Sequence, residues 1–315
     1  MGFTWRSAAL PLAIFALLAA APFLGFSQGW HFTMLARGMV YAMAAISLML
    51  LVGGAGLVSL GHAAMLGVGA YVVVVMDHAG VVEAWKVVPL AVAAAAAFAL
   101  LTGAIAIRTS GVHFIMITLA FGQMAFFATS SLALYGGDDG YTLYNRLELF
   151  GTRALEGRMV FHFTCLALLV LTWALVTALL ASRFGRVLRA ARDNETRARA
   201  VGFEPYPYRL AAYVIAGAIG GLAGVVLANA TEFVAPAYLA WQRSGDLLFM
   251  VILGGLAGPH GALLGAFAYV LVEEWLAKLT EHWRLIFGPL LILCVFFLRG
   301  GLISLPQLLG GRRDG

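Results

Sequence analysis

The chain consists mainly of apolar runs that are long enough to cross a lipid bilayer. A spanning helix needs about 20 apolar residues, and lipid tolerates only helices or closed barrels because backbone polar groups must be satisfied internally. The runs here are continuous, whereas barrel strands would alternate. Only 11% of the residues are charged, against about 25% in soluble domains. We therefore predict an all-α polytopic membrane bundle, a single transmembrane domain over residues 1–315.

The runs predict about eight to ten transmembrane segments, some of them broken or half-length. A polar external stretch over 232–246 precedes two short apolar pieces that are separated by GPHG. The predicted segments are 8–26, 34–54, 56–75, 87–107, 112–134, 159–181, 208–228, 247–256, 262–276 and 285–298.

Arginine placement predicts which side of the membrane each loop occupies. The segment 182–206 holds six arginines against three acidic residues, and cytoplasmic loops collect Lys and Arg. This segment and Arg6 are expected in the cytoplasm, which makes 135–158 an external loop. The net charge of +5 has the same origin, so no nucleic-acid partner is expected. The side of the tail with Arg312 and Arg313 stays open, because it depends on how the broken segment is counted.

An internal repeat is visible in two matching stretches. HAAMLGVGAYV (62–72) aligns with HGALLGAFAYV (260–270), and Arg-x-x-x-Tyr precedes each stretch, at Arg37 and at Arg209. Chance similarity among apolar sequences is the alternative. A true repeat would have halves of about 34–181 and 207–303, related as antiparallel copies, which is the inverted arrangement common in transporters.

The stretch GLVSLGHAAMLGVGAY places glycines and a histidine inside an apolar region. Glycine-interrupted segments in corresponding positions of two halves point to a translocation pathway. The other interpretation is packing, since glycine permits close helix contact and a histidine can hydrogen-bond across it. Both interpretations stay open for the candidate pathway or gating residues Gly61, His62, Gly67, Tyr71 and His260.

The motif GGDDG is the most polar part of the predicted external loop. Glycine and aspartate together favour tight turns, so an external cap is one interpretation. A gating or docking role for Gly136, Gly137, Asp139 and Gly140 is the other.

The arginine-rich segment predicts a cytoplasmic helix. Residues 184–202 contain good helix formers and no proline, and Gly202 would supply a glycine stop. A helix of ordinary period places five residues roughly along one face, namely Val187, Ala190, Ala191, Asn194 and Ala198. A solvated loop that only marks the cytoplasmic side is the alternative.

Motifs of catalysis are absent from the sequence. There is no GxxxxGK[ST], HExxH, GxSxG or paired-cysteine spacing. The predicted spans between residues 8 and 181 contain no carboxylate, which argues against a proton- or sodium-coupled carrier. We therefore predict a protein that is not an enzyme and that holds no cofactor itself.

Several stretches together resemble one family, the LivM-type permeases of branched-chain amino-acid ABC importers. GLVSLGHAAMLGVGAY is similar to that family's GxxSLGHAAFxGxGAY, and SRFGRVLRAARDNETRARAVGFEPYPYR is similar to its SPFGRxLxAIRExExxAxALGxxxxxYK. TLAFGQMAFFATSSLALYGGDDGYT and MVILGGLAGPHGALLGAF resemble two further segments. The similar stretches follow one another in order from about Tyr41 to Gly300.

The resemblance implies a bacterial inner-membrane permease with several partners. They are a second, LivH-type permease, two cytoplasmic ATPases that bind ATP and Mg, and a periplasmic solute-binding protein. The arginine-rich segment corresponds to the coupling helix, with Arg186, Arg189, Arg192, Glu195, Ala198 and Gly202 as coupling residues.

The family implies import of branched-chain amino acids by alternating access. Asp138 and the order of GPHGAL depart from the family pattern, which leaves another solute (urea, a short amide or an aromatic acid) as an alternative. A stand-alone channel or secondary carrier is a third possibility, against which the coupling helix argues.

Overall fold

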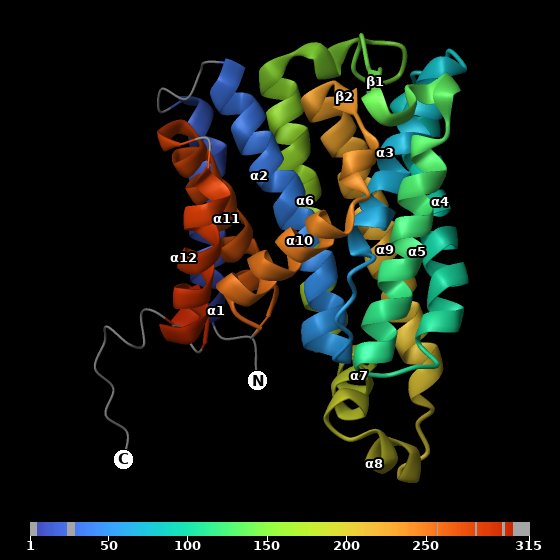
Figure 1. Ribbon diagram of the computed structural model, residues 1–315. Helices are drawn as coiled ribbons and strands as arrows, with labels where there is room; N and C mark the ends of the chain where they lie inside the picture. Colours follow the sequence, from blue (N-terminus) through green and yellow to red (C-terminus); the bar gives the residue numbers. More distant parts are fainter. Residues whose placement is uncertain (1–4, 24–28, 257, 281, 298–299, 305–315) are drawn as a thin grey trace.

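A computed structural model of the chain describes residues 5–23, 29–256, 258–280, 282–297 and 300–304. In this range the protein is a bundle of helices that run up and down between two ends (Figure 1), which confirms the all-α prediction. The α-helices are α1 Trp5–Ala20, α2 Gly29–Met49, α3 His62–His78, α4 Ala84–Ala106, α5 Val112–Ser130, α6 Arg158–Ala181, α7 Arg183–Asp193, α8 Glu195–Ala200, α9 Pro205–Thr231, α10 Trp241–Gly254, α11 Pro259–Leu279 and α12 Trp283–Phe297.

Five helices of the described chain are long and apolar enough to cross a membrane. A sixth span would be the pair Pro236–Gly254 and Pro259–Leu279, which is bent by 116°. Ala9–Phe23 and His62–His78 are shorter apolar helices. The five full-length candidates are Gly29–Ala55, Ala84–Ala106, Val112–Ser130, Arg158–Ala181 and Pro205–Thr231.

The two ends of the bundle differ in character. At one end, β1 (Tyr141–Thr142) pairs antiparallel with β2 (Phe233–Val234), and at the other end α7 and α8 project beyond the apolar helices (Figure 1). α1 begins at the α7 end and α12 runs back toward it (Figure 1). The last described helix therefore ends on the side of the arginine-rich segment, while Arg312 and Arg313 lie outside the described residues.

Two of the helices begin inside the bundle instead of at an end. α2 continues as a π-helix, Leu50–Ala55 (η2), and stops at Gly56, which has a φ of +70°. The chain then returns in non-helical conformation as far as Gly61, and α3 starts there. Between β2 and α10 the chain also returns into the bundle, through the short 3₁₀ helix η6, Pro236–Tyr238 (Figure 1). The expected external stretch over 232–246 is therefore wrong beyond Ala240, because α10 already begins at Trp241 within the bundle.

The direction of the helices corrects the predicted repeat. α2 and α9, which carry the two Arg-x-x-x-Tyr motifs, run in opposite directions, as an inverted repeat requires (Figure 1). α3 and α11, which begin with the matching His62 and His260 stretches, run in the same direction. These two stretches are therefore not antiparallel copies. α10 begins inside the bundle as α3 does, which makes it a candidate counterpart of α3, and the halves 34–181 and 207–303 stay a prediction.

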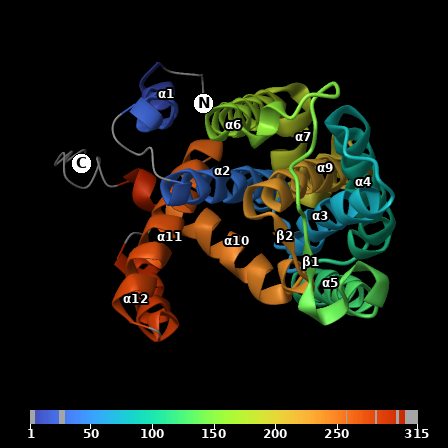
Figure 2. The same ribbon diagram turned by 90° about the horizontal axis from the view of Figure 1, so that it is seen from above.

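Small residues bring α3 and α9 into backbone contact at the centre of the bundle (Figure 2). A Cβ atom on Gly69 would lie 2.1 Å from the carbonyl oxygen of Gly221, and one on Gly224 would lie 1.9 Å from that of Leu66. Lipid tails are as apolar as leucine, so helices in a membrane associate through such close packing instead of through the hydrophobic effect. Within the GLVSLGHAAMLGVGAY stretch, Gly69 is thus the glycine that lets α3 lie directly against α9.

We predict that Gly224→Ala destabilises the bundle, because α3 and α9 would have to separate to admit the methyl group. Overpacking of this kind costs about 1–3 kcal/mol, and thermal unfolding of the purified protein in detergent measures it. The matched control is Gly288→Ala on α12, where a Cβ atom meets nothing within 4 Å. Equal thermal stability of the two variants would contradict the packing role of Gly224.

Candidate functional site

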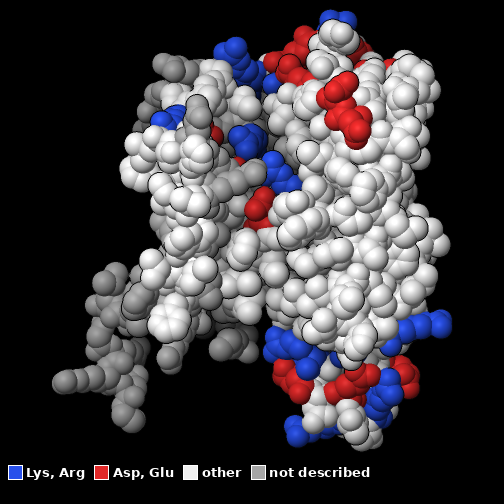
Figure 3. Space-filling model, viewed as in Figure 1, with Lys and Arg blue, Asp and Glu red and all other residues white. Residues whose placement is uncertain are grey.

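A groove with a volume of about 1020 Å³ lies between α5 on one side and α10, α11 and α12 on the other. Figure 3 shows it as a hollow between two lobes, with basic and acidic side chains inside it at mid-height where the lobe surfaces are uncharged. Its walls are largely aromatic and aliphatic. The lining residues include Phe126, Gln242, Arg243, Asp246, Phe249 and Tyr269.

Three polar residues of the groove, Arg243, Asp246 and Tyr269, form one hydrogen-bonded group. Tyr269 of α11 donates its hydroxyl proton to Asp246 Oδ1 at 2.7 Å, and Arg243 Nη1 lies 3.4 Å from Asp246 Oδ2. Tyr269 is buried, whereas Arg243 and Asp246 keep 31% and 27% of their side-chain surface exposed. The pair therefore keeps surface available for a molecule in the groove.

The starts of the two half-length helices meet beside this group. The N–H of Ala63, in the first turn of α3, donates to Ser244 Oγ in the first turn of α10 at 2.9 Å. Arg243 and Ala63 both line a small cavity of about 10 Å³. Helix N-termini carry a partial positive charge and free N–H groups. Two such ends therefore face the same region as the arginine.

The residues predicted as pathway residues on α3 do not line the groove. His62 is fully buried, and its Nε2 lies 2.7 Å from Ser47 Oγ. Because the Ser47 hydroxyl donates to Ala44 O at 2.7 Å, His62 Nε2 is the donor in this contact. A Cβ atom on Gly61 would lie 2.2 Å from Thr118 O. These contacts favour the packing interpretation of this stretch.

Gly67, Tyr71 and His260, which were also predicted as pathway residues, pack between helices. A Cβ atom on Gly67 would lie 2.2 Å from the side chain of Leu239, and Tyr71 is buried. His260 accepts a hydrogen bond at its Nδ1 from Trp173 Nε1 at 3.0 Å. His260 thus joins α11 to α6, outside the groove residues.

The GGDDG motif forms a tight turn at the β1 end. Gly136, Gly137 and Gly140 all have positive φ values, of 91°, 51° and 84°. A Cβ atom on Gly140 would lie 2.6 Å from the ring of Phe233, so glycine permits β1 to approach β2. Asp139 is exposed. The turn thus has the geometry of a cap, and a gating or docking role stays a prediction.

The rest of the loop over 135–158, which was predicted to be external, is hydrogen-bonded to α3 and α9. Leu147 N–H donates to Asn229 Oδ1 at 2.8 Å, and Tyr141 donates to Asp77 Oδ2 at 3.0 Å. Partial burial, together with the Asp77 carboxylate, raises the pKa of Tyr141, so the phenol stays protonated and remains the donor. The loop therefore ties α3 to α9 at this end of the bundle.

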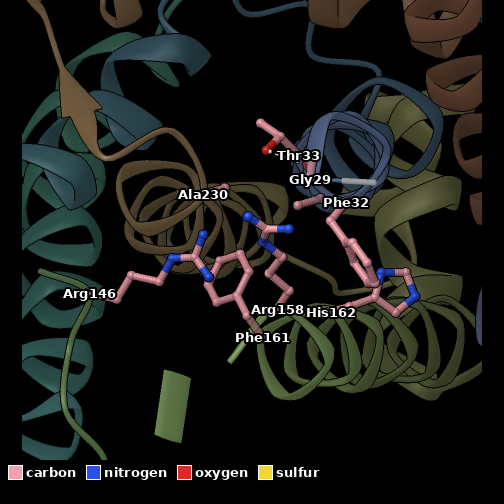
Figure 4. A pocket seen from close by; sticks show the side chains of 9 residues that line it. Gly29, Phe32, Thr33, Arg146, Arg158, Phe161, His162 and Ala230 are labelled. Carbon is pink, nitrogen blue, oxygen red and sulfur yellow. Dashed lines mark hydrogen bonds between the residues drawn. The ribbon is translucent and has the colours of Figure 1, made fainter. Parts of the chain in front are cut away.

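A small pocket of about 40 Å³ lies between α2, α6 and α9 near the same end. The guanidinium groups of Arg146 and Arg158 extend into it beside Phe161 (Figure 4). Arg146 pairs with Glu232 at 3.1 Å and lies over the Phe161 ring. The pocket is therefore positively charged but too small for an amino acid.

The arginine-rich segment is two helices where the sequence predicted one. Asn194 is extended and its Oδ1 accepts from Arg197 N at 2.8 Å, which ends α7 and caps α8. An asparagine followed by an acidic residue is a helix-start signal that could have predicted the break. Gly202 does supply the expected stop, with a φ of +90°, Gly202 N bonded to Arg199 O at 2.9 Å and Phe203 N bonded to Ala198 O at 3.1 Å.

The predicted face of this helix is also partly wrong. The buried residues are Gly185, Leu188, Ala191 and Ala198, whereas Ala190 and Asn194 are exposed and Val187 is half-buried. α7 packs under the ends of α2 and α6, where a Cβ atom on Gly54 would lie 3.1 Å from Leu188 Cδ2.

Several of the predicted coupling arginines bind helix ends within the chain. Arg186 donates to Ala181 O at 3.2 Å and Arg189 donates to Leu180 O at 2.8 Å. Basic side chains at the C-terminal end of a helix satisfy its free carbonyls and its dipole. These two arginines therefore fix α7 to α6.

Arg192 and Glu195 connect α7 and α8 to the two central helices. Arg192 Nη1 donates to Gly53 O in η2, the π-helical end of α2. Glu195 Oε2 pairs with Arg209 Nη1 of α9 at 2.8 Å, and Arg209 Nη2 donates to Ala191 O at 3.1 Å. The arginine-rich segment is thus bonded to the base of α2 and to the base of α9.

The groove residues Arg243 and Asp246 were missed as site residues because their segment was read as an external stretch. The signal was available, since two ionisable residues three apart lie just before an apolar half-helix, and charges at membrane depth are usually functional. In the described part of the chain, no group of three or more His, Cys, Asp or Glu residues could hold a metal ion.

We predict that Ser47→Ala destabilises the protein by about 1–3 kcal/mol, because His62 Nε2 would lose its partner in a buried site. The double variant Ser47→Ala, His62→Leu should cost less than the sum of the single changes, since both polar groups are then removed. Thermal unfolding measures all three variants. Ser131→Ala, at an exposed position on the C-cap of α5, is the control. Unchanged stability with lost transport would instead indicate a gating role.

Residues 31–295 match the family described as branched-chain amino acid transport system / permease component. The chain is 28% identical to the high-affinity branched-chain amino acid transport system permease protein LivM of Escherichia coli K12, over 98% of this chain and 78% of that protein.

Two further relatives are more distant or shorter in their match. A probable branched-chain amino acid transport permease protein LivM of Methanocaldococcus jannaschii is 31% identical over 46% of each chain. The autoinducer 2 import system permease protein LsrC of Yersinia pestis is 26% identical over 92% of this chain and 84% of that protein. No solved structure matches the chain significantly. With the match covering most of its length, this chain belongs to the family of branched-chain amino acid transport system permease components.

Proposed function

We propose that this chain is the permease subunit of an ATP-binding cassette importer that moves branched-chain amino acids across the bacterial inner membrane. It is a multi-pass membrane protein of a permease family, and the substrate named for its relatives LivM is the branched-chain amino acid. The arginine-rich α7–α8 end would face the cytoplasm together with the start of α1. The β1 end would face the periplasm.

The groove between α5 and α10–α12 is the observation that carries this proposal. Its volume of about 1020 Å³ exceeds the needs of a single amino acid. It holds charged side chains at mid-height, where the neighbouring lobe surfaces carry none (Figure 3). Discontinuous helices that begin at membrane depth typically form transporter binding sites. We infer that the solute passes through this groove.

The partners are proposed from the family, and the open side of the groove and the two ends of the bundle offer places for them. A second, LivH-type permease would cover the groove, so that the pathway lies between the two subunits. Two cytoplasmic ATPases would dock at α7 and α8, and they would bind ATP and Mg. A periplasmic solute-binding protein would dock at the β1 end, where the GGDDG turn is exposed. The permease itself performs no chemistry on the solute.

The contacts of α7 and α8 support a mechanical route from the ATPases to the groove. Arg192 holds the π-helical end of α2, from which the chain returns to the start of α3. Glu195 holds Arg209 at the start of α9. A displacement of the docked helices would therefore move α2 and α9 together, and packed helices move as rigid bodies between discrete arrangements.

The transport proposal is tested with the complete importer in proteoliposomes. We expect ATP-dependent uptake of leucine, isoleucine and valine, and no uptake when the ATPases cannot hydrolyse ATP. Uptake without the ATPases would indicate a channel or a secondary carrier instead. Uptake of urea, a short amide or an aromatic acid in place of leucine would keep the architecture and reject the substrate.

The coupling proposal is tested by Glu195→Gln, which removes the charge that holds Arg209. Loss of a charged hydrogen bond of about 2 kcal/mol should reduce the solute-stimulated ATPase rate and uptake in parallel, by up to about tenfold. Gly202→Val, which forces a β-branched residue into a positive φ, should act in the same direction. The control is Glu204→Gln, an exposed carboxylate in the same segment. Full stimulation in both test variants would contradict the coupling assignment.

A further inference from the structure

The charged pair of the groove stands out from its surroundings. Arg243 and Asp246 lie at membrane depth in a wall that is otherwise mainly apolar, and ionisable residues at that depth are costly and usually functional. The ion pair is long, with 3.4 Å between Arg243 Nη1 and Asp246 Oδ2. Each side chain also keeps about 30% of its surface exposed. The pair therefore keeps polar surface that a molecule in the groove could contact.

We propose that Arg243 and Asp246 bind the two charged ends of a zwitterionic α-amino acid, with Arg243 on the carboxylate and Asp246 on the ammonium group. The inference rests on the proposed transport function and names the site within the groove at which the solute is recognised. The two ends of an α-amino acid are one carbon apart, and the two side chains lie one helical turn apart on α10.

The carboxylate end is matched by three features of the same region. The guanidinium of Arg243 presents several N–H donors in a planar fork that suits a carboxylate. α10 begins at Trp241, so the positive end of its dipole lies beside Arg243. The start of α3 adds a second positive helix end, since Ala63 and Arg243 line one small cavity.

The ammonium end is matched by the orientation of the Asp246 carboxylate. Tyr269 is buried and donates to Asp246 Oδ1 at 2.7 Å, which holds the carboxylate in one orientation. Tyr269 thereby acts as a positioning residue and leaves lone pairs of the carboxylate for an ammonium group. An uncharged or purely anionic solute would leave Asp246 without such a partner, which disfavours it.

The apolar side chain of the solute would lie against the aromatic wall. Phe249 follows Asp246 by one turn on α10, and Phe126 of α5 faces the groove from the opposite side. A branched aliphatic side chain is stabilised there by removal of its apolar surface from water. The site would thus require both charges and an apolar side chain.

The test measures ligand protection of a cysteine beside the pair, in the complete importer held in nanodiscs without the solute-binding protein. Gln242→Cys is introduced into a chain whose Cys165 and Cys294 have been replaced by alanine, and the rate of maleimide labelling is measured. We expect saturating leucine to slow labelling severalfold. The probes 3-methylbutylamine and 4-methylpentanoate, which lack the carboxylate and the ammonium group respectively, should protect at least about tenfold more weakly.

Variants then assign each charge to its partner. Arg243→Gln should abolish the advantage of leucine over 3-methylbutylamine, and Arg243→Lys should restore part of it. Asp246→Asn should abolish the advantage of leucine over 4-methylpentanoate, and Tyr269→Phe should weaken it. Arg158→Gln, which removes an arginine far from the groove, is the matched control and should behave as the parent does. Assembly of each complex is checked by size-exclusion chromatography.

The outcomes separate this inference from the transport proposal. If the parent complex takes up leucine but leucine does not slow labelling, or the two truncated probes protect as well as leucine, the zwitterion site is wrong and the transport function stands. If the complex takes up no amino acid, the transport function is wrong. Retention of full leucine protection in Arg243→Gln would overturn the role of Arg243.

Discussion

The hydrogen bond from the Ala63 N–H to Ser244 Oγ is the contact on which the centre of the bundle depends. A helix that starts at membrane depth exposes N–H groups for which lipid offers no partner. The start of α3 finds its partner on α10, and the non-helical return before it is bonded to α5, where Thr118 Oγ1 accepts from Leu60 N at 3.3 Å. The break is therefore possible only where several helices enclose it, and this requirement brings α10 and α5 to the two sides of one groove.

Apolar run length predicted most of the fold, because each full-length helix is a physical consequence of bilayer thickness. It failed at α10, where Arg243 and Asp246 read as an external stretch although they lie at the start of a helix inside the bundle. A single sequence does not tell a charge in water from a charge in a groove, because both lower the local hydropathy equally. The tertiary enclosure of the segment decides between them.

The candidate site was predicted less well than the fold, and for a related reason. The His62 stretch was conspicuous because glycine and histidine are costly in an apolar helix, yet the structure uses them for close contact with α9 and α5. The unusual residues of the His62 stretch therefore marked a place where helices pack closely. The similarity of the His260 stretch came from the same requirement, since Gly261 and Gly265 of α11 press against the backbone of α10. Shared packing chemistry, without a shared place in the topology, explains the match.

The position of the groove explains why it would need a second subunit. Its polar group lies at mid-height on an open side of the chain (Figure 3), and a charged pair next to lipid loses the solvation that water or protein would give it. A partner helix bundle would remove the pair from lipid and leave a closed space for the solute. Because Arg192 and Glu195 bond α7 and α8 to α2 and α9, movement at that end would be transmitted to the helices that enclose α3. Arg243 and Asp246 then lie at the level from which the groove would open toward either side of the membrane.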